Sequence, residues 1–309
     1  MAAPAAFKAY QYENYGNPIE ELKLNASVVQ PALKATHVRV QVHSAALNPV
    51  DYVLIGELGL VLTGATPSAA SPYRIGFDAA GVVVEVGAGV TSGLRLSDAV
   101  YAMTPFTGFG TFAEYVDIDE QYVALKPALV THGKIQEGSR VLILGGSGGT
   151  GTFAVQIAKA MGAHVITTTS FRNAEFVKGL GADQVIDYTQ EKWVDVLKPH
   201  SIDVIYDCGM EPEAWNGDAQ KVLKKDTGHF VTILNIPEPI IESGIGAQKT
   251  RVRVQASAAD LQKLTELIES GKIVTTIDSV YPFGNLHGAI TKLKSSRARG
   301  KIIMHVGKQ

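Results

Sequence analysis

One short stretch near the middle of the chain restricts its fold more strongly than any other. Four apolar residues at 141–144 predict a buried strand, and an apolar stripe over residues 152–161 predicts a helix. Between them, Gly146, Gly148 and Gly151 satisfy the pattern G-x-G-x-x-G. A glycine-rich turn between a strand and a helix is the context in which this pattern binds a dinucleotide.

Each glycine of the pattern has its own physical reason. The first permits the tight turn, the second lets the backbone approach a pyrophosphate, and the third lets the helix pack closely on the strand. Unpaired N–H groups at the start of the helix then meet the phosphates. A P-loop is excluded because no Gly-Lys-Ser/Thr closes the pattern. Residues 141–158 are uncharged and long enough for a membrane span, but the glycines and the strand-then-helix pattern argue against a transmembrane segment.

The composition is that of an ordinary soluble globular protein. The 309 residues allow two domains, and a formal net charge of -2 gives no basic surplus that would indicate nucleic acid. A single cysteine, Cys208, excludes internal disulfides and multi-cysteine zinc sites and fits a reducing compartment. The N-terminus lacks the basic region and apolar core of a signal peptide. A cytoplasmic protein is expected, with organelle import after removal of a transit peptide as the alternative.

Two patterns of secondary structure divide the chain. Residues 1–123 carry short strands separated by glycine turns, as in a partly open barrel, whereas residues 124–257 alternate strands and helices. The fold class is therefore α/β, with a Rossmann domain and a β-rich domain to which residues 258–309 return. Strands of the β-rich domain are expected at 38–42, 81–87, 99–103 and 112–116. The six parallel Rossmann strands are expected at 141–144, 164–168, 184–186, 203–206, 229–234 and 251–254.

The end of the second Rossmann strand bears on which dinucleotide binds. A domain that prefers NAD places Asp or Glu about 20 residues past the glycine pattern, but residues 167–173 contain no acid. Hydroxyl groups and Arg172 stand there instead, and an arginine can hold a 2′-phosphate through two hydrogen bonds. NADPH is therefore the expected cofactor. The alternative is a solvated turn with an incidental arginine.

No complete catalytic group is visible in the sequence. Zinc requires three or four His, Cys or carboxylate ligands, and the eight histidines are scattered. Tyr188 and Lys192 have the spacing of the tyrosine–lysine pair of short-chain dehydrogenases, but they follow the glycine pattern too closely for that family. Cys208 lacks the neighbouring histidine motif of a nucleophile, yet it follows a strand whose carboxyl end would border the nicotinamide.

Several stretches spread over nearly the whole chain match one family. They are Ala-Leu-Asn-Pro-Val-Asp-Tyr at 46–52, Gly-Phe-Asp-Ala-Ala-Gly-Val-Val at 76–83, Gly-Thr-Phe-Ala-Glu-Tyr at 110–115, the glycine-rich run at 138–151, Leu-Gly-Ala-Asp at 180–183, Asp-Val-Ile-Tyr-Asp-Cys at 203–208 and Arg-Gly-Lys-Ile at 299–302. Through them the chain resembles the medium-chain dehydrogenase/reductase superfamily, and within it the zinc-free, zeta-crystallin-like quinone oxidoreductases. Residues 171–181 are most similar to the plant chloroplast-envelope quinone oxidoreductase and alkenal reductase subgroup.

The resemblance implies a GroES-like fold for the β-rich domain and a role for each candidate cofactor residue. It assigns the pyrophosphate to Ser147, Gly148, Gly149 and Thr150, the 2′-phosphate to Ser170, Arg172 and Asn173, the adenosine to Tyr188, and the nicotinamide half to Cys208 and Leu234. Zinc-binding relatives carry a cysteine about where Asp51 stands and Gly-His-Glu about where residues 76–78 stand. The resemblance therefore implies an enzyme without zinc.

The expected reaction is the transfer of hydride from NADPH to a quinone or a conjugated carbonyl in the cleft between the domains. Such a reaction depends on hydride positioning and on hydrogen-bond donors. Asn48 and Tyr52 are the expected catalytic residues: both orient the acceptor, and Tyr52 or water supplies the proton. The alternative for Tyr52 is an aromatic core residue. Phe106 and Phe109 are expected either to cover a flat ring or to pack within the protein.

Two further expectations concern activity and assembly. The family carries an extra helix before Gly138, where this chain has only residues 128–137. This departure favours an alternative function, an NADPH-binding regulatory or structural protein with little catalysis. An enone or alkenal double-bond reductase is a second alternative, whereas a zinc alcohol dehydrogenase is disfavoured by the single cysteine. The strand predicted at 251–254 would lie at the open edge of the Rossmann sheet, and an exposed edge strand needs to be covered. Related proteins pair this edge with that of a second copy, so a homodimer is expected.

Overall fold

The computed structural model describes residues 3–56, 58–64, 66–105, 110–123, 135–252 and 258–307. The chain divides into two compact units. The first unit comprises Met1–Lys126, Gln255–Leu264 and Ile277–Gln309, and the second comprises Pro127–Val254 and Thr265–Thr276. The predicted features at Phe106, Phe109, residues 128–134 and residues 253–254 lie outside the described residues.

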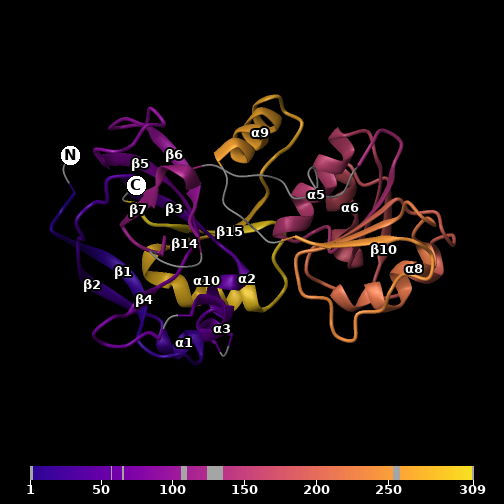
Figure 1. Ribbon diagram of the computed structural model, residues 1–309, viewed down its shortest axis with the longest axis horizontal. Coiled ribbons are helices and arrows are strands. Elements are labelled where there is room, and N and C mark those ends of the chain that lie inside the picture. Colours follow the sequence, from indigo (N-terminus) through magenta and orange to yellow (C-terminus); the bar gives the residue numbers. More distant parts are fainter. Residues whose placement is uncertain are drawn as a thin grey trace. The chain divides into compact units, whose positions relative to one another are not determined.

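The second unit is built on one parallel sheet, drawn in magenta to orange in Figure 1. Its strand order is β10-β9-β8-β11-β12-β13, and every neighbouring pair is parallel. Numbered from the first strand of the unit, this order is 3-2-1-4-5-6, so the predicted six-stranded Rossmann sheet is confirmed. The strands are β8 (Arg140–Leu144), β9 (His164–Thr169), β10 (Gln184–Asp187), β11 (Val204–Asp207), β12 (His229–Thr232) and β13 (Gln248–Arg251).

The last Rossmann strand lies three residues earlier than predicted, because its sequence is polar. Strand β13 pairs with β12 from Gln248 opposite His229 to Arg251 opposite Thr232. It is an edge strand of this sheet with no fully buried residue, so it lacks an apolar signature. The alternating apolar residues that suggested a strand at 251–254 begin where the observed strand ends.

Short helices connect the strands of the second unit. Helix α5 (Gly149–Ala160) packs on β8 and β9, and α6 (Ala174–Gly179) packs on β10. The start of α5 lies before the predicted residue 152, so the end of the glycine pattern is itself helical. The described residues of this part also form α7 (Trp193–Val196) and α8 (Asp218–Val222), with short 3-10 helices at Phe171–Asn173 and Pro212–Asn216.

The segment Thr265–Thr276, which was expected in the β-rich domain, groups with the Rossmann sheet. It includes the end of helix α9 (Ala258–Glu269). The buried amide of Gln156 on α5 donates to the carbonyl of Val274 (3.0 Å) and accepts from its N–H (2.8 Å). These two hydrogen bonds satisfy both ends of a buried side chain, which ties this segment to the second unit.

The first unit contains two sheets. In the larger sheet, β14-β15-β3-β5-β6 are neighbours in that order and β7 pairs with β3; the smaller sheet has the order β2-β1-β4. Strand β7 lies later than the predicted 112–116, because it pairs along His37–Gln41 of β3. The strands are β1 (Ala6–Tyr12), β2 (Lys23–Val29), β3 (His37–Leu47), β4 (Tyr73–Arg74), β5 (Asp78–Val86), β6 (Ala99–Met103), β7 (Tyr115–Asp119), β14 (Ile277–Pro282) and β15 (Lys301–His305).

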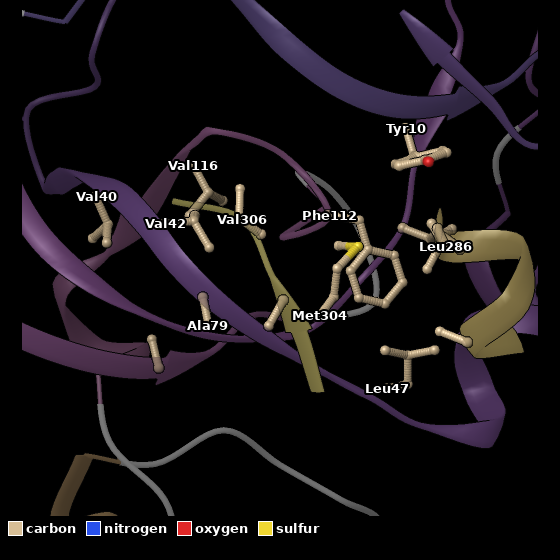
Figure 2. Close-up of a cluster of buried hydrophobic side chains, with 14 of the residues drawn as sticks. Tyr10, Val40, Val42, Leu47, Ala79, Phe112, Val116, Leu286, Met304 and Val306 are labelled. Atoms are coloured by element: carbon tan, nitrogen blue, oxygen red, sulfur yellow. The ribbon is translucent and has the colours of Figure 1, made fainter. Parts of the chain in front are cut away.

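The core of the first unit joins strands from both ends of the chain (Figure 2). Met304 and Val306, from β15 and the residue after it, pack with side chains of β3 such as Val42 and Leu47. Helix α10 (Leu286–Lys294) adds Leu286, and the described part of the unit also contains α1 (Pro18–Glu21), α2 (Pro49–Val53) and α3 (Gly59–Thr63). No helix within the described ranges is long and apolar enough to cross a membrane.

Candidate functional site

The glycine turn between β8 and α5 requires two of its three pattern glycines for packing. A Cβ on Gly146 would lie 2.0 Å from Oγ1 of Thr167, and a Cβ on Gly151 would lie 2.1 Å from the carbonyl oxygen of Gly145. Both contacts are far below van der Waals distance. Gly146 and Gly151 therefore allow the close approach of turn, strand and helix, as the sequence pattern predicts.

Gly148, the second pattern glycine, has no such packing reason. A Cβ there would meet only the carbonyl oxygen of Gly145, at 3.6 Å, which is ordinary van der Waals contact. Its φ of -79° and ψ of 176° suit any residue. Gly148 is the N-cap of α5, and no side chain caps the helix. The first N–H groups of the helix thus lie beside an open position, an arrangement that fits a phosphate group.

The loop carrying Ser147 is held by the end of strand β9. Thr169 Oγ1 donates to Ser147 Oγ (2.9 Å), and Asn173 Nδ2 donates to the same oxygen (3.1 Å). Thr168 Oγ1 accepts from the N–H of Gly145 at 3.0 Å, so successive threonines of β9 contact the turn. All three threonines, at 167–169, are buried. The sequence had indicated their hydroxyl groups and their lack of negative charge as a preference for NADPH; their structural role was missed.

The residues predicted to bind the adenosine half lie where β9 and β10 end. Ser170 and the exposed Arg172 follow β9, and the N–H of Tyr188 donates to the carbonyl oxygen of Thr169 at 3.3 Å. The Tyr188 side chain is 56% exposed. Asn173 differs from its predicted neighbours because it is buried and its amide is engaged with the Ser147 loop. Its assignment to the 2′-phosphate therefore remains a prediction.

A buried carboxylate that sequence reasoning overlooked organises the ends of β11 and β12. Asp207 Oδ1 accepts three backbone N–H groups, from Gly209 (3.1 Å), Met210 (2.7 Å) and Glu211 (3.0 Å). Its Oδ2 accepts from Oγ1 of Thr232 at 2.7 Å. An aspartate at the end of a strand, with a glycine two residues later, is the available sequence signal for such a turn.

The hydrogen bonds of Asp207 lie next to the two residues that were predicted to line the nicotinamide half of the cofactor site. Cys208 follows Asp207 directly and is partly exposed, and Leu234 is exposed with its N–H donating to Thr232 Oγ1 at 3.1 Å. Both residues lie beyond the carboxyl ends of parallel strands, where ligands bind in open α/β sheets. Burial of the sulfur raises the pKa of Cys208, and the negative charge of Asp207 adds to this rise, so the group stays a thiol near neutral pH.

In the first unit, Asn48 belongs to a compact group of polar side chains. Its Nδ2 donates to Asp78 Oδ2 (2.8 Å), and its Oδ1 accepts from the ammonium of Lys301 (2.5 Å). The backbone N–H of Asn48 donates to Asp51 Oδ2 at 2.6 Å. Asp51 is fully buried on α2, and its Oδ1 has no partner among the described residues.

Burial raises the pKa of Asp51 to about 8. The negative charge of Asp78 raises it further, whereas the N–H of Asn48 and the ammonium of Lys301 oppose the rise. A protonated carboxyl is therefore the dominant form near neutral pH. Its burial and its hydrogen bond to the N-cap backbone of α2 indicate a structural role for Asp51.

Tyr52 lies one residue further along α2. It was expected either to orient the acceptor or to be an aromatic core residue. Its ring is partly buried against the core of the first unit, and the Lys294 ammonium lies 5.8 Å from the ring centroid. Within the described part of the chain its hydroxyl has no hydrogen-bond partner. The ring therefore packs as a core aromatic, and a role of the hydroxyl toward a ligand remains a prediction.

The described residues contain no group of three or more His, Cys, Asp or Glu side chains that could hold a metal ion. The residues at the positions of the zinc ligands in metal-binding relatives are Asp51, Phe77 and Asp78. Phe77 is buried and apolar, and Asp78 is bonded to Asn48. Asp51 and Asp78 each accept a hydrogen bond from Asn48, Asp51 from its backbone N–H and Asp78 from its side-chain amide.

The Rossmann strand order and the open glycine turn define the class: an α/β protein of the dinucleotide-binding type. Family models agree, because residues 34–128 match the alcohol dehydrogenase GroES-like domain and residues 180–304 match the zinc-binding dehydrogenase family. The chain belongs to the medium-chain dehydrogenase/reductase superfamily. The predicted family and the GroES-like assignment of the β-rich unit are thus confirmed.

Individual relatives cover almost the whole chain. A 2-methylene-furan-3-one reductase of Solanum lycopersicum is 32% identical over 99% of this chain and 80% of its own length. An NADPH-dependent alkenal/one oxidoreductase, chloroplastic, of Arabidopsis thaliana is 32% identical over 98% of this chain and 80% of its own length. The structure of the quinone oxidoreductase from Coxiella burnetii superposes with a TM-score of 0.85 at 26% identity, covering 97% of this chain and 99% of that one. The prediction of an enzyme of the oxidoreductase class is confirmed by these relatives.

Proposed function

We propose that this chain is an NADPH-dependent, zinc-independent reductase of quinones or conjugated carbonyls. The observation that carries the proposal is the open position at Gly148, because the glycine there serves no packing purpose and lies at an uncapped helix start. Relatives named as quinone or alkenal/one oxidoreductases support the class of acceptor.

In this proposal the second unit holds the cofactor. The pyrophosphate binds at the turn formed by Gly146, Ser147, Gly148, Gly149 and Thr150. Ser170, Arg172 and Asn173 hold the 2′-phosphate, Tyr188 contacts the adenosine, and Cys208 and Leu234 line the nicotinamide half. NADPH, when bound, supplies the hydride. The protein supplies binding energy, orientation and the exclusion of water from the reacting atoms.

The first unit contributes the residues that handle the acceptor. The Asn48 amide has one N–H bonded to Asp78, which leaves its second N–H for the oxygen of a quinone or enone. The Tyr52 hydroxyl orients the same acceptor, and Tyr52 or water supplies the proton that follows hydride addition. A donor aimed at an oxygen that gains negative charge lowers the barrier more than it strengthens ground-state binding.

The test is the oxidation of NADPH and of NADH, followed by the absorbance of the reduced nicotinamide, with a quinone and separately with an enone. Quinone- or enone-dependent turnover that is faster with NADPH than with NADH supports the proposal. Identification of the product separates carbonyl reduction from reduction of the conjugated double bond. Binding of NADPH without acceptor-dependent oxidation would favour the non-catalytic alternative.

We further propose that two copies of the chain pair through the edge of the Rossmann sheet. Among the described strands of that sheet, β13 pairs only with β12, so its outer backbone groups need a partner or water. Sedimentation velocity distinguishes the dimer from a monomer. A cytoplasmic location remains a prediction, while the alkenal/one oxidoreductase relative is named as chloroplastic.

A further inference from the structure

The orientation of the Asn48 amide is determined by opposite charges at its two ends. The ammonium of Lys301 donates to Oδ1, and the carboxylate of Asp78 accepts from Nδ2. The reversed amide would place its NH2 group against an ammonium and its oxygen against a carboxylate. Only one orientation of the amide satisfies both neighbours.

The register of the larger sheet brings these distant residues together. Strand β3 lies between β15 and β5, with Leu47 opposite Ile302 and Ala46 opposite Asp78. Asn48 follows β3 directly and Lys301 begins β15, so both lie at the same end of the sheet as Asp78. The Lys301 ammonium also lies 3.4 Å from Asp78 Oδ2, which closes a triangle of three side chains.

The side chains of the triangle are partly buried. The side chains of Lys301 and Asp78 are 19% and 27% exposed, so their charges act more strongly than those of a fully exposed pair. The ammonium at Oδ1 also polarises the amide and makes its N–H groups stronger donors. Within the described residues, the second Nδ2 hydrogen of Asn48 has no acceptor.

We propose that Lys301 is a positioning residue of the reductase: its ammonium holds and polarises the Asn48 amide, so that the free N–H is presented to the acceptor oxygen. This inference rests on the proposed role of Asn48. Lys301 acts through the amide, and no contact of its own with the acceptor is required.

A double-mutant cycle tests the inference, because a residue that acts through Asn48 loses its effect once Asn48 is removed. We expect Lys301→Met to lower kcat for a quinone about tenfold in the native background, less than the loss from deleting a transition-state donor outright. In the Asn48→Ala background the same change is expected to lower kcat less than about twofold. Calorimetric titration with the quinone should show the same non-additivity in acceptor affinity.

The matched control is Lys292→Met on α10. Lys292 also pairs with an aspartate of this unit, Asp278, at 3.3 Å, and it is not part of the triangle. This variant should leave kcat unchanged in both backgrounds. Circular dichroism establishes that each variant is folded, and Lys301→Gln, which keeps a donor without the charge, replaces Lys301→Met if the latter does not fold.

Two results would overturn the inference, and they are distinguishable. Equal losses from Lys301→Met in both backgrounds would show that Lys301 does not act through Asn48, while the proposed function would stand. Full turnover of Asn48→Ala alone would remove the proposed role of Asn48 and the inference with it.

Discussion

Replacement of Gly148 by alanine separates the requirements of folding from those of cofactor binding. The added methyl group would lie 3.6 Å from its nearest neighbour, the carbonyl oxygen of Gly145, and the backbone angles at this position suit alanine. Alanine also reduces the conformational entropy of the unfolded chain. We therefore expect the second unit to keep its free energy of unfolding or to gain about 0.4–1 kcal/mol.

The same methyl group occupies the space that a pyrophosphate needs in order to reach the helix start. Loss of one hydrogen bond to a charged group costs about 1.5–3 kcal/mol, which corresponds to an NADPH affinity lower by roughly 10- to 150-fold. Affinity is measured by calorimetric titration with NADPH. Unfolding of the second unit is followed by tryptophan fluorescence, because Trp193 and Trp215 are the two tryptophans of the chain and both belong to this unit.

Gly146→Ala provides the contrast. Its Cβ would lie 2.0 Å from Thr167 Oγ1, so we expect this variant to lose about 1–3 kcal/mol of stability. If Gly148→Ala were to bind NADPH as tightly as the native protein, the pyrophosphate could not lie against this backbone, and the reasoning from the open position would be wrong.

Three further predictions concern charged side chains. Asp51→Asn should remove a pH dependence of the free energy of unfolding. Asp51 stays protonated up to about pH 8 in the folded protein but only up to about pH 4 in the unfolded chain. The folded state therefore binds more protons between these values, and the stability of the native protein falls as the pH rises through them. The stability of the variant relative to the native protein should therefore increase by about 1.4 kcal/mol per pH unit between about pH 5 and pH 7. Hydrogen exchange in β3 measures both stabilities, and a stability difference that does not change with pH would contradict the raised pKa. Arg172→Ala should weaken NADPH binding at least about tenfold and leave NADH binding unchanged, and equal losses would show that the arginine does not contact the 2′-phosphate. Asp207→Asn places an amide NH2 group where one carboxylate oxygen accepted hydrogen bonds, so tryptophan fluorescence should show a loss of about 1–3 kcal/mol, and unchanged stability would contradict this role.

The Rossmann half of the fold could be predicted because its signals are local. A buried strand, a glycine turn and an apolar helix face stand next to one another in the sequence, and each remaining parallel strand except the last is a short apolar run. Strand β13 was predicted at the wrong residues because it lacks such a local apolar signal. This edge strand is fixed by backbone hydrogen bonds to β12 rather than by apolar side chains, so the sequence carries little sign of it.

The polar groups of the candidate sites were harder to predict, since they depend on register between distant strands. Asn48 and Lys301 are separated by most of the chain, yet the pairing of β15 with β3 places them in hydrogen-bond contact. The resemblance had drawn attention to Asn48 and to residues 299–302 as separate stretches. Nothing in the sequence indicated that Lys301 bonds to the amide of Asn48.

The charges at the carboxyl edge of the Rossmann sheet bear on the proposed binding of a phosphate-bearing cofactor. Strands β10 and β11 both end in aspartates, which by themselves would repel phosphates. Asp187 accepts from the N–H and Oγ1 of Thr189, and Asp207 accepts three backbone N–H groups and a hydroxyl, so each carboxylate is directed to its own turn. The uncapped start of α5 and the guanidinium of Arg172 supply positive potential at the same edge. This distribution of charge supports the proposed binding of NADPH, and it explains how a sheet edge rich in acids can accept an anionic cofactor.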